Sequence, residues 1–172
     1  MSQARQPHGL RGPAPRTGLP AHMSAAPEAV AAREERIREL DKTCRRLSLE
    51  LARRRGRELY DAAPAESSGL RVHENTIGSG AIGDDVRAEA QSYAASPRAV
   101  YLAFSRDPAS ILLAVSPDAA LDAGAVLRKA LAASGGRGGG NAALAQGSAP
   151  GAEALDLTVA AIRGAVGSVR LT

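Results

Sequence analysis

Residues 134–147 read SGGRGGGNAALAQG, with five glycines and one arginine among the first seven. A regular helical pattern precedes this stretch, and the stretch itself ends in a short apolar run. Glycine tolerates positive φ and close approach of other groups, but each glycine costs chain entropy on folding. Building a core does not require such a cluster. We therefore predict a glycine-rich loop here, whose backbone a ligand or partner must approach closely.

The residue types in this loop indicate an anion site. Successive backbone N–H groups in a glycine-rich turn can form a concavity for an anion, and the guanidinium of Arg137 adds a planar donor fork suited to phosphate. The alternative is a flexible segment without function. We favour binding, because a helix ends at the first glycine and a strand begins after the last. The candidate binding residues are Gly135, Gly136, Arg137, Gly138, Gly139, Gly140, Asn141 and Gln146.

The patterns around the glycines predict an α/β fold. One Phe, three Tyr and no Trp leave Ala, Val, Leu and Ile to form the core. In chain order we predict a strand at 70–77, a helix at 84–96, and strands at 98–105 and 110–116. A helix follows, with Ser116 as its cap, Pro117 at its start and Ala120 on its apolar stripe. After the loop come the strand NAALAQ and a last helix, whose apolar stripe consists of Leu155, Val159, Ile162 and Val166. This order predicts a small domain with a mixed sheet.

We divide the chain into four segments by composition and period. Residues 1–27 are rich in Pro, Gly and Arg without a period, which predicts a disordered tail. Residues 28–62 form one long helical arm, 63–69 a linker, and 70–172 the α/β domain.

The arm carries an apolar seam. Ile37, Leu40, Cys44, Leu47 and Leu51 follow spacings of 3, 4, 3 and 4, which are the a and d positions of a heptad. Such a stripe needs a partner helix, from this chain or from another, so we expect a homodimer or a helical partner. Cys44, a small residue at a seam position, is expected to be buried.

Positive charge concentrates late in the arm. Residues 42–57 hold seven bases against Glu50 alone. Arg45, Arg46 and Arg53 lie away from the seam, which is compatible with a polyanion contact. The structural alternative is a solvated face in favourable alignment with the helix dipole.

A second glycine motif gives an alternative function. GSGAIG, from Gly78 to Gly83, matches G-x-G-x-x-G between a predicted strand and a predicted helix, the context of a dinucleotide site. The following segment looks like an antiparallel hairpin rather than a second crossover. We therefore rank a small nucleotide-binding domain below an ordinary turn.

Other classes of function lack their residues. Cys44 is the single cysteine, and His8, His22 and His73 show no metal-ligand spacing, so we expect no metal, no cofactor and no catalytic residue. No apolar run is long enough to span a bilayer, and the N-terminus lacks an apolar signal core. We expect a cytoplasmic protein, with a mitochondrial location as the alternative.

The segment LRKALAASGGRGGGNAALAQGSAP, residues 127–150, resembles the glycine-rich signature of the DHH-associated domain that closes alanyl-tRNA synthetases and free-standing alanyl-tRNA editing proteins. Asn141 departs from the basic or histidine residue usual at that position of the family.

The resemblance implies that the loop, with Arg137 and Gln146, contacts tRNA or its phosphates, and that the arm drives dimerisation. In editing proteins a zinc domain with paired histidines and a Cys/His pair performs the hydrolysis. Those ligands are absent from this sequence, so the resemblance implies a non-catalytic C-terminal part that works with an editing domain elsewhere.

Overall fold

The structure is a computed structural model that describes residues 25–169. The predicted tail, except for its last three residues, lies outside the described residues. The chain divides into two compact units, residues 1–42 and 43–172. Helix α1 (Ala25–Ala62) crosses the boundary, and in the first unit it is held by exposed ion pairs such as Arg38 with Glu34.

The second unit is built on one five-stranded mixed sheet. Its elements are β1 (Arg71–Ile77), α2 (Asp84–Ala94), β2 (Ala99–Arg106), β3 (Ala109–Val115), α3 (Ala123–Ala133), β4 (Arg137–Gly140), β5 (Leu144–Ser148) and α4 (Ala152–Gly167). The strand order is β1-β2-β3-β5-β4. Strands β1 and β2 are parallel and joined through α2, whereas every other pair is antiparallel. The predicted α/β fold with a mixed sheet is confirmed.

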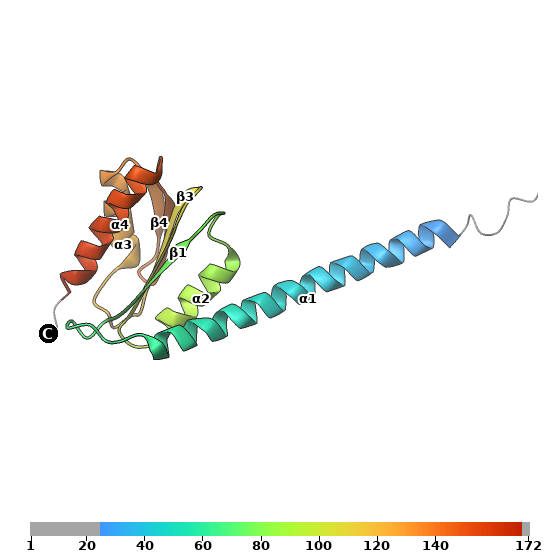
Figure 1. The fold of residues 1–172 in the computed structure, drawn as a ribbon, viewed down its shortest axis with the longest axis horizontal. Helices are drawn as coiled ribbons and strands as arrows, with labels where there is room; N and C mark the ends of the chain where they lie inside the picture. Colours follow the sequence, from blue (N-terminus) through green and yellow to red (C-terminus); the bar gives the residue numbers. More distant parts are fainter. Residues whose placement is uncertain (1–24, 170–172) are drawn as a thin grey trace, which may run out of the picture. The chain divides into compact units, whose positions relative to one another are not determined.

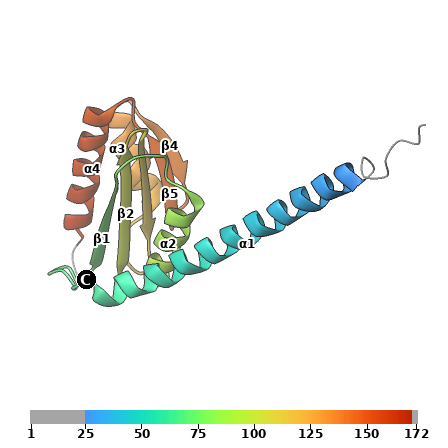
Figure 2. The ribbon, with the colours of Figure 1, turned by 45° about the vertical axis from the view of Figure 1, so that its right-hand side comes forward.

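Helices cover both faces of the sheet. Helices α3 and α4 lie on one face and α2 lies on the other, as Figures 1 and 2 show. Side chains alternate along each strand, so each face has its own core: Leu113 and Leu127 belong to the α3/α4 side, and Tyr101 and Leu112 to the α2 side. The apolar stripe predicted for the last helix is buried at all four positions.

Helix α3 begins later than the sequence pattern suggested. Asp122, not Ser116, is its N-cap, and the Asp122 carboxylate accepts a hydrogen bond from the backbone N–H of Ala125 at 2.8 Å. Ser116 instead accepts a hydrogen bond from the first residue of β2. Ala120, predicted on the helical stripe, has a φ of 53°. The prediction of a helix start at Pro117 is therefore wrong, because residues 117–120 form a turn and a bend and the helix begins only at Ala123.

Small residues dock the C-terminal part of α1 on α2. Gly56 of α1 leaves no room for a Cβ, which would lie 2.9 Å from Cβ of Ser92 and 3.1 Å from the backbone nitrogen of Tyr93. The Ser92 hydroxyl also donates to the carbonyl of Arg53 at 2.6 Å. Ala52, one turn before Gly56, is buried. This packing face is different from the predicted seam, whose residue Leu51 is 68% exposed.

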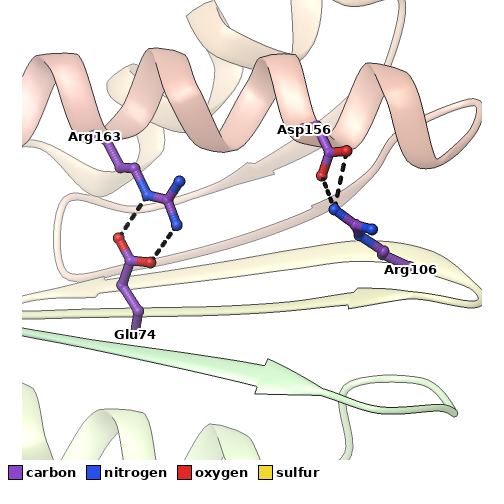
Figure 3. Close-up of polar contacts among 4 residues, drawn as sticks. All are labelled: Glu74, Arg106, Asp156 and Arg163. Carbon is purple, nitrogen blue, oxygen red and sulfur yellow. Dashed lines mark hydrogen bonds and ion pairs between the residues drawn. The ribbon is translucent and has the colours of Figure 1, made fainter.

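Two ion pairs hold α4 over the first two strands (Figure 3). Arg163 donates two hydrogen bonds to Glu74 of β1, at 2.8 and 2.6 Å, and Arg106 of β2 contacts Asp156 at 2.9 Å. The Arg163 hydrogen bond lowers the pKa of Glu74. Within the described residues, no helix is both long enough and apolar enough to cross a membrane.

Candidate nucleic-acid interface

The glycine-rich segment is a packed strand rather than a loop. Arg137–Gly140 forms β4, which pairs with β5. A Cβ at Gly138 would lie 2.5 Å from Cδ1 of Leu131 on α3 and 2.7 Å from Cα of Gly147. A Cβ at Gly136 would lie 2.7 Å from both Leu131 and the carbonyl of Ser148. Our expectation that core packing does not require these glycines is therefore wrong.

Two further glycines also have structural roles. Gly135 has a φ of +75° directly after α3, where it ends the helix in the left-handed conformation. A Cβ at Gly140 would collide with the backbone of Leu144 and Ala145.

Helix α3 packs directly on the hairpin β4–β5, because Gly124 of α3 lies against the carbonyls of Gly140 and Asn141.

Gly139 is the exception among the β4 glycines. A Cβ there would meet nothing within 4 Å, and its φ lies outside the positive range. Gly139 pairs with Gln146, which points to the α2 side of the sheet because Leu144 does so and strand side chains alternate. Strand β4 is the last strand of the sheet. The surface over Gly139 is thus open on the face away from α3.

Arg137, Gln146 and Arg87 surround this open surface. Arg137 pairs with Ser148 and therefore shares the face of Gln146, as its diagonal neighbour at roughly 7–8 Å. Arg87 of α2 donates a hydrogen bond to Oε1 of Gln146. The side chain of Arg137 is exposed and forms no hydrogen bond or ion pair within residues 25–169. Two guanidinium groups and the amide group of Gln146 thus gather at one end of the hairpin. Arg87 was not among the predicted binding residues, because an arginine on a predicted helix gives no signal of this contact in the sequence.

Two serine residues follow on the neighbouring strands, one exposed and one buried. Ser148 is exposed and pairs with Ser110 of β3, whose Oγ is buried without a hydrogen-bond partner among the described residues. Neither serine was among the predicted binding residues.

Asn141 lies at the opposite end of β4 from Arg137. Its Oδ1 accepts hydrogen bonds from the backbone N–H groups of Ala143 and Leu144, at 3.0 and 2.9 Å, and so closes the hairpin turn. This is an Asx-type turn, a common role of asparagine. Only the Nδ2 donor of Asn141 is left to face a ligand.

Most arginines of the arm have acidic neighbours. Arg45 pairs with Asp84 of α2 at 2.5 Å, and Arg46 pairs with Glu50 at 2.9 Å. Arg53 has no ion pair within the part of the chain that the structure describes. The structure does not bring these three side chains into contact with β4–β5, and exposed pairs of this kind leave only part of the predicted positive potential.

The GSGAIG segment connects β1 to α2. Gly80 donates its N–H to the carbonyl of Asp107 at 2.8 Å, and Gly83 precedes the first turn of α2. Asp84 and Asp85 occupy that turn, where their negative charges oppose a phosphate. The next connection, β2 to β3, is an antiparallel hairpin as expected.

A polar network lies beneath α2, beside the candidate interface. The Tyr101 hydroxyl donates to Glu89 at 2.5 Å and accepts from Asn75 at 2.9 Å, and Arg55 pairs with Glu89 at 3.4 Å. Burial, with a smaller effect of the hydrogen bond to Glu89, raises the pKa of Tyr101. Burial also lowers the pKa of His73, which contacts the Tyr101 ring. The network fixes α2 on the sheet.

The fold and this surface define a small α/β domain with a glycine-rich hairpin at the edge of a mixed sheet. Residues 72–168 match the family model of the DHHA1 domain, and the chain belongs to this family. The predicted resemblance to DHH-associated domains is confirmed, and membership fits a nucleic-acid-binding module.

Two solved structures are similar at low sequence identity. The C-Ala domain from Aquifex aeolicus alanyl-tRNA synthetase aligns with 22% identity and a TM-score of 0.48, over 60% of this chain and 95% of that chain. A DHH-domain structure described as a member of the s1p family of ribosomal proteins aligns with 16% identity and a TM-score of 0.46, over 71% of this chain and 31% of that chain. No curated protein matches the chain.

Proposed function

We propose that this domain binds RNA, with tRNA as the specific candidate, by holding phosphates on the open face of the hairpin β4–β5. One observation carries the proposal: Gly139 lacks a side chain although packing leaves room for one, and it lies beside the guanidinium of Arg137, which has no partner among residues 25–169. Open backbone next to a planar donor fork suits close approach of a phosphate. The glycine-rich signature shared with alanyl-tRNA synthetases and editing proteins is the reason for naming tRNA.

The domain acts in this proposal as a binding part and not as a catalyst. Within the described residues, no group of three or more His, Cys, Asp or Glu side chains is placed to hold a metal ion. The editing chemistry belongs to a zinc domain supplied by a partner, to which this domain presents the tRNA. Arg53 of the arm adds a distant, non-specific phosphate contact.

Replacing Arg137 with alanine should weaken binding of tRNA about fivefold and lower the slope of log affinity against log salt by about one, because one phosphate contact is lost. The measurement is fluorescence anisotropy across a salt series. Arg128→Ala is the matched control, since Arg128 is exposed on α3, on the other face of the sheet. Equal affinities of Arg137→Ala and the wild type would reject the proposed interface.

We also propose that the arm associates through its seam. Ile37, Leu40, Leu47 and Leu51 are each at least 47% exposed, and Cys44 is exposed too, against our expectation of a buried thiol. Leu40→Asp combined with Leu47→Asp should convert a dimer to a monomer in analytical ultracentrifugation, because each buried Leu contributes about 1.5–3 kcal/mol to such a contact. An unchanged mass in the double variant would exclude the seam.

A further inference from the structure

A pocket lies between the C-terminal end of α2 and β5. Arg87 and Gln91 of α2 and the C-cap residue Ala95 recur every four residues and form one stripe on that side of the helix. At one end of the stripe, Arg87 contacts Gln146 of β5. At the other end, Gln91 and Ala95 share a pocket with Leu144 of the same strand. The pocket and the contact between Arg87 and Gln146 therefore involve the same side of α2 and the same strand, β5.

The pocket at the Ala95 end of this stripe is mainly apolar and has two amide groups. Its volume is about 330 Å³, which lies within the usual range of small-ligand sites. Its walls include Ala94, Ala95, Pro117 and Leu144, and its polar groups are Gln91 and Asn141. None of the described residues that line it is charged, so it does not suit a phosphate.

The amide groups are available for hydrogen bonds. Asn141 uses Oδ1 in the hairpin turn and keeps its Nδ2 donor. The side chain of Gln91 is exposed and forms no hydrogen bond within residues 25–169. A ligand in this pocket can therefore be held between apolar walls and recognised along a polar edge.

Distances along β5 connect the pocket to the phosphate surface. Leu144 and Gln146 lie on the same face two residues apart, which is roughly 7 Å along a strand. The ligand that matches this arrangement has a flat apolar body with a polar edge, and an anionic group a short distance away. A nucleotide of a nucleic-acid strand has this chemistry.

We propose that the pocket between α2 and β5 receives one unpaired nucleobase of the bound RNA, while the adjoining phosphates lie at Gln146 and Arg137. This inference rests on the proposed function. Apolar side chains can sandwich an unstacked base, and amide groups can read its edge. Bases in an A-form duplex are stacked and paired, so none of them can enter a pocket. The RNA segment at this site is therefore a single-stranded end or loop.

The test compares a single-stranded RNA hexamer with an abasic hexamer that has the same ribose-phosphate chain. The wild-type protein should bind the base-bearing hexamer about tenfold more tightly, which corresponds to about 1.4 kcal/mol for the one base that the pocket holds. Ala95→Phe fills the pocket from an exposed position and should reduce this ratio to near one. Ala132→Phe, at an exposed position of α3, is the matched control and should keep the full ratio.

The variants separate the pocket from the phosphate surface. Arg137→Ala should weaken both hexamers by the same factor and leave their ratio unchanged. A ratio near one in the wild type, or a full ratio in Ala95→Phe, overturns the base pocket while an effect of Arg137→Ala still supports the phosphate surface. A free mononucleotide that binds as tightly as the hexamer also overturns the inference. Insensitivity of both hexamers to Arg137→Ala counts against the proposed function itself.

Discussion

Replacing Gly138 with alanine is expected to lower the free energy of unfolding by about 2–3 kcal/mol, the upper range for overpacking a core. The added methyl group would lie 2.5 Å from Leu131, 2.7 Å from the backbone of Gly147 and 2.8 Å from the carbonyl of Gln146. Leu131 could rotate, but the two backbone atoms belong to the paired strand and cannot move alone. The measurement is urea unfolding followed by circular dichroism.

Gly139→Ala is the matched variant, one residue further along the same strand. Its methyl group enters open space, and its backbone is compatible with alanine. We expect this variant to raise the free energy of unfolding by at most about 1 kcal/mol, because alanine has fewer conformations than glycine in the unfolded chain. Equal destabilisation by the two variants would show that backbone geometry, and not the contact with α3, requires glycine in β4.

The pair also separates structure from binding. Gly139→Val projects a larger side chain over the surface between Arg137 and Gln146, and strands accept β-branched residues well. This variant should fold normally and bind tRNA more weakly than the wild type. A folded Gly139→Val protein with unchanged affinity would argue against close approach of RNA at this point.

The elements of the second unit were largely predictable from periodicity. The last helix repeats apolar residues at Leu155, Val159 and Ile162, and all three are buried in α4. Strands β2 and β3 are continuous apolar runs that lie in the middle of the sheet, where both faces are covered. These patterns follow from local burial and therefore can be recognised along the sequence.

The glycine-rich strand could not be predicted in the same way. Its pairing with β5 and its contact with Leu131 are tertiary, and a run of glycines carries no alternation of polar and apolar residues. The sequence signal for a loop was therefore strong and wrong. Gly56 is a similar case, because a glycine inside a helix indicates a close packing partner without saying which.

Only part of the candidate site could be predicted, again because some of its contacts are tertiary. Arg137 and Gln146 were recognisable by their neighbours in sequence, and the pairing of β4 with β5 brings them to one face. Arg87 lies 50 residues before Arg137 and reaches Gln146 only because α2 packs on the sheet. No local pattern records such a contact.

The second large effect is expected at Glu89, whose side chain is 7% exposed. Glu89→Ala should lower the free energy of unfolding by about 2–3 kcal/mol, because the buried Tyr101 hydroxyl loses its acceptor. Glu89→Gln keeps an acceptor oxygen at nearly the same place and loses only the charge facing the exposed Arg55. That variant should cost about 1 kcal/mol or less. Glu153→Ala, at an exposed position of α4, is the control for removing a carboxylate.

The position of α2 connects this network to RNA binding. Glu89 holds the buried side of α2 to Tyr101 in the sheet, whereas Arg87 and Gln91 extend from the same helix toward β5. When the buried bonds are lost, α2 is free to shift, and the contact between Arg87 and Gln146 weakens. Glu89→Ala should therefore reduce affinity for the single-stranded hexamer at temperatures where the variant is still folded, whereas Glu89→Gln should not. If both variants bind like the wild type, the anchoring of α2 by Glu89 contributes to stability alone, and RNA binding does not depend on it.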